Sequence, residues 1–269
     1  MLLALDIGNS SIGVGLFEGE RLSLRAKLSV DRKRTADEYA VILCTLLGER
    51  GAQVTEAVIG SVEPRLTHTL ETAVARLGSA DALIPILHIG GGVRTGISLR
   101  VDDPTSLGAD IVTNAAAAVA LYGAPVVFFD YGTATVAGAV NAARELVGVT
   151  ITPGLAASLD ALREAAALIP YVELKAPAST LGKSTAAAVS SGVVVGTAAM
   201  TDGLIDRIRD ELGLPPDTPL PVVATGGLAP LVVPACRYPL YHEPDLTLYG
   251  LAHIYRATAE REARMKKKS

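Results

Sequence analysis

The chain contains 269 residues, of which 49% are hydrophobic and 19% are charged. This length is sufficient for two domains, and the apolar content supplies a large core, which excludes a mostly disordered protein. The net charge of −4 argues against nucleic acid as the main partner. Two cysteines, Cys44 and Cys236, are too few for a disulfide framework and predict a reduced, cytoplasmic protein.

Two long uncharged stretches, residues 111–129 and 184–201, raise the question of a membrane span. The first contains Gly123 and Pro125, and the second contains two glycines, so packed elements of a folded domain explain both stretches better. The N-terminal segment lacks the basic region of a signal peptide. We therefore expect no membrane partner.

Strands and helices alternate in the first part of the chain. An apolar run at residues 2–5 ends at Asp6, and a bend of glycine, asparagine and serine leads to a second apolar run at 12–17, which predicts a β-hairpin. Thr35 has the side chain of an N-cap. The alternation predicts an α/β architecture. The elements expected after the hairpin are a helix over 36–48, a strand over 57–62 and a helix over 67–77.

The opening pattern returns in the middle of the chain. The apolar run 125–129 ends at Asp130, and a bend with glycine and threonine leads into another apolar run. The order of these features is the same as around Asp6, so we interpret them as an internal duplication. Two lobes are therefore predicted, residues 1–118 and residues 119–269. The other elements expected are helices over 105–121, 155–168, 184–212 and 247–264 and a strand over 221–224.

Both hairpin bends have the parts of a phosphate site. Backbone N–H groups at a glycine-containing bend point at an anion, and hydroxyl or amide side chains add donors. Asp6 and Asp130 end their strands, where a carboxylate can hold Mg²⁺ beside phosphates, directly or through water. One such bend also occurs in ordinary turns, but two copies favour nucleotide binding. Gly226 and Gly227 follow a later strand and allow a flat ring or a ribose to approach the backbone. This order of elements is typical of the actin/hexokinase/Hsp70 ATPase superfold.

Two other nucleotide signatures are incomplete. Residues 182–185 read Gly-Lys-Ser-Thr like the end of a P-loop, but Pro177 occupies the position of the first glycine and no strand leads directly into the loop. Residues 90–92 are three glycines, but Thr95 stands where a Rossmann turn needs its third glycine. The sequence therefore favours neither a P-loop nor a Rossmann site.

Nine short motifs are spread over nearly the whole chain. They are Asp6-Ile7-Gly8-Asn9-Ser10, Ser61-Val62-Glu63-Pro64, Asp103-Pro104, Leu107-Gly108-Ala109-Asp110, Asp130-Tyr131-Gly132-Thr133-Ala134-Thr135, Pro153-Gly154, Gly182-Lys183-Ser184-Thr185, Thr225-Gly226-Gly227 and Leu246-Thr247-Leu248-Tyr249-Gly250-Leu251. In order and approximate spacing this set resembles the type III pantothenate kinases. The resemblance implies two duplicated ribonuclease-H-like lobes with ATP in the cleft. It also implies a small-molecule kinase that converts pantothenate to 4′-phosphopantothenate, the first step of coenzyme A biosynthesis.

The resemblance implies roles for the matching residues. Asp110 is the implied catalytic base, which takes the proton from the primary hydroxyl of pantothenate; from the residues alone, an acid in an early helical turn is also explained by the helix dipole. Asp130 is implied to hold a monovalent cation, K⁺ or NH₄⁺, and the family works with Mg²⁺ as a homodimer. The expected ATP contacts are Asp6, Ile7, Gly8, Asn9, Ser10, Ser11, Ile12, Gly13, Thr133, Gly226 and Gly227. The expected substrate contacts are Gly108, Ala109, Asp110, Ile111 and Thr185.

Four positions differ from the residues usual in that family. Ile111 stands in place of arginine, Val101 in place of tyrosine, Val136 in place of threonine, and Val149 in place of glycine. These differences leave two alternatives to an active pantothenate kinase. One is a catalytically degenerate homologue with a binding or regulatory role, and the other is a kinase for another small hydroxy acid.

Overall fold

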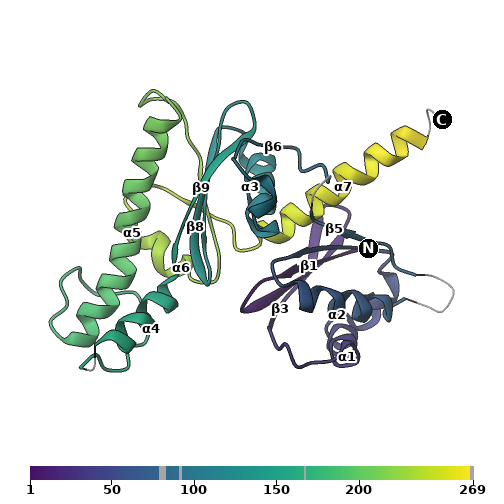
Figure 1. Ribbon diagram of the computed structural model, residues 1–269, viewed down its shortest axis with the longest axis horizontal. Coiled ribbons are helices and arrows are strands. Elements are labelled where there is room, and N and C mark those ends of the chain that lie inside the picture. The colour runs from purple at the N-terminus through teal and green to yellow at the C-terminus, as the bar shows by residue number, and fades with distance from the viewer. Residues whose placement is uncertain (79–82, 91–92, 167, 267–269) are drawn as a thin grey trace. The chain divides into compact units, whose positions relative to one another are not determined.

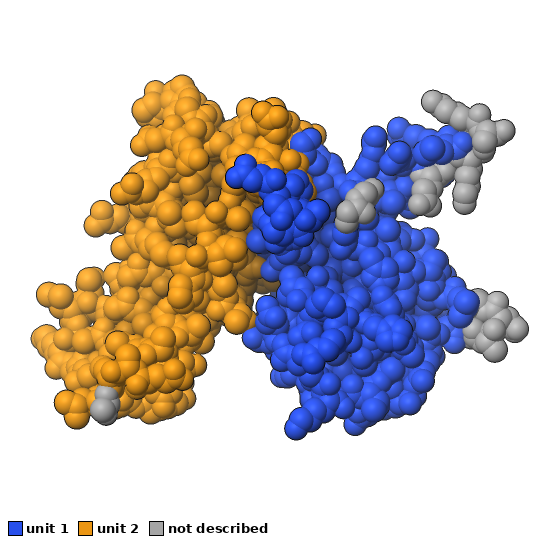
Figure 2. Space-filling model, viewed as in Figure 1, with its two compact units in different colours: residues 1–98, 102–120, 246–269 blue, residues 99–101, 121–245 orange. Residues whose placement is uncertain are grey.

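The computed structural model describes residues 1–78, 83–90, 93–166 and 168–266. The chain divides into two compact units, which Figure 2 colours separately. The first unit comprises residues 1–98, 102–120 and 246–269, and the second comprises residues 99–101 and 121–245. Both combine a sheet with helices (Figure 1), which confirms the predicted α/β class.

The first unit is built from strands, helices and two short 3-10 helices. Its elements in chain order are β1 Leu2–Ile7, β2 Ser11–Glu18, β3 Arg21–Ser29, α1 Ala36–Leu47, η1 Gly48–Gln53, β4 Glu56–Ser61, α2 Pro64–Ala75, β5 Ile86–His88, η2 Pro104–Ser106, α3 Ala109–Tyr122 and α7 Leu246–Lys266. The elements of the second unit and its border are β6 Ser98–Leu99, β7 Val126–Tyr131, β8 Ala134–Val140, β9 Glu145–Pro153, α4 Leu155–Ala165, α5 Thr185–Glu211, β10 Val222–Thr225, α6 Ala229–Val232, η3 Val233–Ala235 and β11 Tyr241–His242.

The two sheets repeat one topology. In the described parts of the chain the first sheet has the order β3-β2-β1-β4-β5, and the second has the order β9-β8-β7-β10-β11 with β6 added beside β9. The strands β2 and β8 run antiparallel to β1 and β7, whereas β4 and β10 run parallel to them. This equivalence confirms the internal duplication that the sequence predicts around Asp6 and Asp130.

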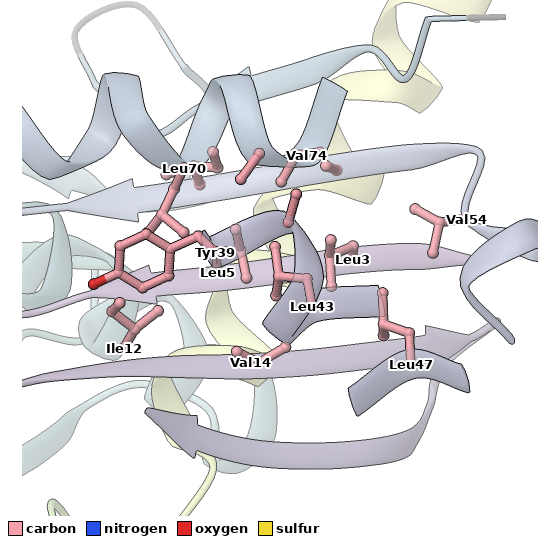
Figure 3. Packing of buried hydrophobic residues seen from close by; sticks show 14 of the residues in the cluster. Leu3, Leu5, Ile12, Val14, Tyr39, Leu43, Leu47, Val54, Leu70 and Val74 are labelled. Carbon is pink, nitrogen blue, oxygen red and sulfur yellow. The ribbon is translucent and has the colours of Figure 1, made fainter. Parts of the chain in front are cut away.

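One face of the first sheet is covered by α1 and α2. Tyr39 and Leu43 of α1 and Leu70 of α2 point toward Leu3 and Leu5 of β1 in Figure 3, and all five side chains are fully buried. Apolar residues recur every third or fourth position on both helices, which places them on one helical face. The predicted N-cap of α1 is confirmed, because the Thr35 side chain and Glu38 form a capping box.

The C-terminal helix α7 packs on the other face of the same sheet. Leu251 and Ala252 of α7 are buried in one cluster with Ala4, Phe17 and Val58 of the strands. Strand side chains alternate between the two faces, so β1 supplies both layers. The helix therefore belongs to the first unit, whereas the predicted division placed residues 246–269 in the second lobe. The other predicted border, after residue 118, lies two residues from the end of the segment 102–120.

Helix α5 is the core helix of the second unit. Among the described residues it is the one helix long and apolar enough to cross a membrane by length and composition, and 39% of its most apolar window is buried within the protein. Val194, Ala198 and Ile205 of this helix pack with Val127 and Phe129 of β7. Core helices of folded domains can also be this long and apolar. The contacts of α5 with β7 identify it as such a core helix.

Two helices begin elsewhere than predicted. Helix α3 begins at Ala109 rather than at residue 105, because Asp103 caps the short turn that follows it by accepting from the Thr105 N–H at 2.9 Å, and Leu107 is extended. Helix α2 begins at Pro64 rather than at residue 67, since proline is well suited to the first helical position.

Candidate functional site

The bend between β1 and β2 is closed by a hydrogen bond from Gly8 N–H to the Ser11 carbonyl at 3.0 Å. The Ile7 and Ile12 side chains on either side of the bend are fully buried and anchor it to the core. Asn9 at the tip of the bend is exposed. The bend therefore holds the exposed amide side chain of Asn9 on a fixed base, which agrees with the predicted anion site.

Two neighbouring segments hold this bend at its ends. The N–H of Val62, just after β4, donates to the Ile7 carbonyl at 3.0 Å. The N–H of Val30, just after β3, donates to the Ser10 carbonyl at 3.1 Å. Asp6 lies opposite Gly13 in the β1–β2 register, so its carboxylate stands beside a position without a side chain. The structure thus brings together the predicted residues 6–13.

Asp110 is the second residue of α3, where a carboxylate is favoured by the helix dipole. Its Oδ1 accepts from the Ile111 N–H at 2.9 Å. Burial raises the pKa of Asp110 above its ordinary value, and this hydrogen bond opposes the shift only in part. A carboxyl group with a raised pKa is suited to act as a general base near neutral pH.

Gly108 makes room for that carboxylate. A Cβ at this position would overlap Oδ1 of Asp110 and would lie 3.3 Å from Cγ1 of Val62. Any larger residue would therefore push the carboxylate out of place. Val62 lies next to the open space above Gly108, and its N–H donates to Ile7, so it stands between the predicted substrate segment and the bend at residues 8–11 inside one unit.

The second bend, between β7 and β8, corresponds to the first and is one residue shorter. Gly132 N–H donates to the Ala134 carbonyl at 3.0 Å, and the Thr133 carbonyl accepts from Gly154 N–H at 3.1 Å. The Thr133 side chain is exposed at the tip. Asp130 is partly buried and lies opposite Val136 in the strand register. The Pro153-Gly154 motif therefore supports this bend from β9.

The glycine turn after β10 lies against the second bend. Gly226 has φ of +92°, which disfavours side chains, and a Cβ there would come within 2.5 Å of Oδ1 of Asp130 and of Tyr131 N. Leu228 N–H donates to the Tyr131 carbonyl at 3.1 Å. The structure thus brings together Asp130, Gly226 and, through the bend, Thr133 within the second unit.

Thr185 is the first residue of α5 and is exposed, one residue after the N-cap Ser184. It belongs to the second unit and Asp110 to the first, so a shared substrate site of these residues stays a prediction, as does the cleft for ATP. In the described residues 168–184 no strand leads into the Gly-Lys-Ser-Thr segment. Of the glycines at residues 90–92, the second and third lie outside the described residues.

Cation binding at Asp6 and Asp130 remains predicted. Within the described parts of the chain no three His, Cys, Asp or Glu residues form a cluster that could hold a metal ion. Mg²⁺ in kinases is held by one or two carboxylates together with the phosphates of the substrate. The single aspartate beside each bend supplies too few ligands to hold a metal ion by itself. It can hold a cation to which nucleotide phosphates supply further ligands.

The residues that differ from the family pattern are mostly apolar neighbours of the site. Ile111 is 7% exposed and belongs to the core, and Val136 lies beside Asp130. Arg100, the nearest cation in sequence before Asp110, has its Nε 3.9 Å from Oε1 of Glu145 in the second unit.

No pattern in the sequence predicts the residues that support the first bend. Val62 and Glu63 belong to a recognised motif, but their sequence gives no sign of what they contact. Nothing in the sequence connects Glu63 with Arg32, its ion-pair partner 31 residues earlier. A glutamate next to the first proline of a helix, followed by Arg65, was the available signal, and it is unspecific.

Known proteins match the chain over nearly its full length. A type III pantothenate kinase from Nocardia farcinica is 43% identical over 265 residues, which cover 97% of this chain and 99% of that protein. One from Streptomyces griseus is 40% identical over 268 residues, which cover 97% of this chain and 100% of that protein. Among solved structures, the activator of the 2-hydroxyisocaproyl-CoA dehydratase from Clostridium difficile with bound ADPNP has a TM-score of 0.51 at 12% identity and covers 100% of this chain and 97% of that one.

The likeness to solved structures concerns the fold alone, which is that of the actin/hexokinase/Hsp70 ATPases with two sheets of repeated topology. The sequence pattern of the type III pantothenate kinases matches residues 2–207, more than half of the chain. Together with the curated relatives that match over nearly full length, this shows that the chain belongs to the type III pantothenate kinase family.

Proposed function

We propose that the protein transfers the γ-phosphoryl group of ATP to the primary hydroxyl of pantothenate, giving 4′-phosphopantothenate and ADP. The observation that carries the proposal is the placement of Asp110, a partly buried carboxylate with a raised pKa, near Gly108 and Val62, and Val62 N–H donates to Ile7 at the start of the first bend. A kinase of a small alcohol needs this pair of features, one to accept a proton and the other to hold phosphate.

In the proposed reaction Asp110 accepts the proton of the pantothenate hydroxyl while that oxygen forms a bond to the γ-phosphorus. The bond between the γ-phosphorus and the bridging oxygen of ATP breaks, and ADP leaves with the electron pair. The hydrogen bond from Ile111 N–H fixes one oxygen of the carboxylate. Phosphoryl transfer asks little covalent chemistry of a protein, so positioning and charge stabilisation suffice.

The other predicted residues complete the proposed site. Residues 6–13, Thr133, Gly226 and Gly227 bind ATP, and Gly108, Ala109, Ile111 and Thr185 bind pantothenate. Mg²⁺ beside Asp6 neutralises phosphate charge, and K⁺ or NH₄⁺ binds at Asp130. The proposal includes a homodimer, which light scattering after gel filtration would test, and a cytoplasmic setting, which agrees with free Cys44 and Cys236.

The test is formation of ADP from ATP and Mg²⁺ with and without pantothenate, together with the melting temperature at millimolar ATP. We expect pantothenate-dependent turnover, stimulation by K⁺, and a rise in melting temperature with ATP. ATP binding without turnover would favour the binding or regulatory alternative. Turnover with another hydroxy acid but not with pantothenate would favour a different substrate.

A further inference from the structure

Arg32 and Glu63 form an ion pair between two loops of the first unit. Nε of Arg32 donates to Oε2 of Glu63 at 2.7 Å. The Glu63 side chain is 11% exposed, whereas that of Arg32 is 48% exposed. A charge-assisted bond to a carboxylate largely withdrawn from water is stronger than one between two solvated side chains. This pair can therefore hold its two loops together.

The two loops are those that support the phosphate bend. Glu63 follows Val62, whose N–H donates to the carbonyl at the start of the bend, Ile7. Arg32 lies two residues after Val30, whose N–H donates to Ser10 near the other end of the bend. The ion pair thus closes a ring of contacts that runs from one end of the bend, through both loops, to its other end.

Both loops are anchored to the body of the unit. The Tyr39 hydroxyl, on a fully buried side chain, donates to the Asp31 carbonyl at 3.0 Å and accepts from Asp31 N–H at 3.2 Å. Ser61 Oγ accepts from Glu63 N–H at 3.0 Å and from the Thr67 hydroxyl at 2.6 Å. The bend at the other side of the ring carries the exposed Asn9 and Ser10, so the two anchored loops can act as its frame.

Glu63 also contacts a second arginine. Nε of Arg65 lies 3.7 Å from Oε1, but Arg65 is 84% exposed and is only two residues away along the same chain segment. It therefore connects no separate loops. The hydrogen bond from Arg32 lowers the pKa of Glu63 against the opposing effect of burial, so the carboxylate is ionised at neutral pH.

We propose that the Arg32–Glu63 ion pair is a positioning device that keeps the bend at residues 8–11 in its phosphate-binding conformation. The inference rests on the proposed kinase function. A misplacement of about 1 Å can cost on the order of 10²-fold in rate where groups must be aligned. Loosening the frame should therefore weaken ATP binding more than pantothenate binding.

The test compares Arg32→Gln and Glu63→Gln with the matched control Arg65→Gln, which removes the other cation from the same carboxylate. For each variant the KM values of ATP and pantothenate, kcat, the calorimetric Kd of ATP and the melting temperature are measured. We expect both test variants to raise the KM and Kd of ATP by roughly 10-fold, and the double variant to be no worse than either single one, because the residues act as one unit. Arg65→Gln should stay within about twofold of wild type, and Arg32→Lys should recover part of the loss.

An unchanged Kd of ATP in both test variants would overturn the proposal. So would equal losses for ATP, pantothenate and melting temperature, since these would indicate a merely structural pair. If Glu63→Gln fails to fold, the test relies on Arg32→Gln, which should fold because the Arg32 side chain is half-exposed. The calorimetric Kd of ATP does not depend on the phosphoryl acceptor. If the wild type binds ATP without phosphorylating pantothenate, the proposed function is refuted. The Kd values of the variants then still show whether the ion pair positions the bend.

Discussion

Replacing Asp110 by asparagine should separate catalysis from stability in this protein. The change keeps the size of the side chain, and its carbonyl oxygen can still accept from Ile111 N–H, as Oδ1 now does at 2.9 Å. It removes the proton acceptor. Loss of a general base typically costs ~10²–10⁴-fold in kcat. At about 1.36 kcal/mol per decade this is roughly 2.7–5.4 kcal/mol of transition-state stabilisation.

The same substitution should raise the melting temperature at neutral pH. Burial raises the folded-state pKa of Asp110 above the ordinary value of 3.8. Between these two values the folded state binds more protons than the unfolded state, so stability falls as the pH rises through that window. At neutral pH the ionised carboxylate therefore costs stability, and asparagine removes that cost, as is common at functional sites.

The assay is pantothenate-dependent ADP formation over a range of pH, with calorimetric ATP binding as the control. In the wild type kcat should fall on the acid side, at a pH above that of an ordinary aspartate, because the base must be deprotonated. The variant should bind ATP within about twofold of wild type. Near wild-type kcat in the variant, or a lower melting temperature, would refute the reasoning.

Three further substitutions test the site. Gly108→Ala should displace the Asp110 carboxylate and lower kcat by roughly 10²-fold while ATP binding stays intact; unchanged kcat would show that the carboxylate can act from elsewhere. Gly226→Ala, at a φ of +92° and against Asp130, should destabilise the protein by roughly 1–3 kcal/mol and raise the KM of ATP; differential scanning fluorimetry with an unchanged melting temperature would contradict this. Ile111→Arg should lower the KM of pantothenate by roughly 10–150-fold through pairing with its carboxylate, at a cost in melting temperature because residue 111 is 7% exposed; an unchanged KM would place that carboxylate away from residue 111.

The sequence was most informative where structure depends on near neighbours. The sequence predicted the N-cap at Thr35, the two strand–bend–strand patterns at Asp6 and Asp130, and the glycine turn at Gly226, because turns and caps involve residues within a few positions of each other. The start of α3 was not predicted, since Asp103 caps a separate short turn, η2, and the extended Leu107 ends that turn before the helix begins.

By itself the sequence determined the α/β class, the duplication and the candidate phosphate bends, since apolar periodicity and repeated motifs are properties of the linear order. The tertiary structure decided which distant segments meet. It placed α7 on the first sheet through Leu251, joined Arg32 to Glu63, and set Val62 against both Ile7 and Gly108. The contacts of Val62 and Glu63 depend on the parallel pairing of β1 with β4 across a crossover connection, which brings together residues that no local pattern connects.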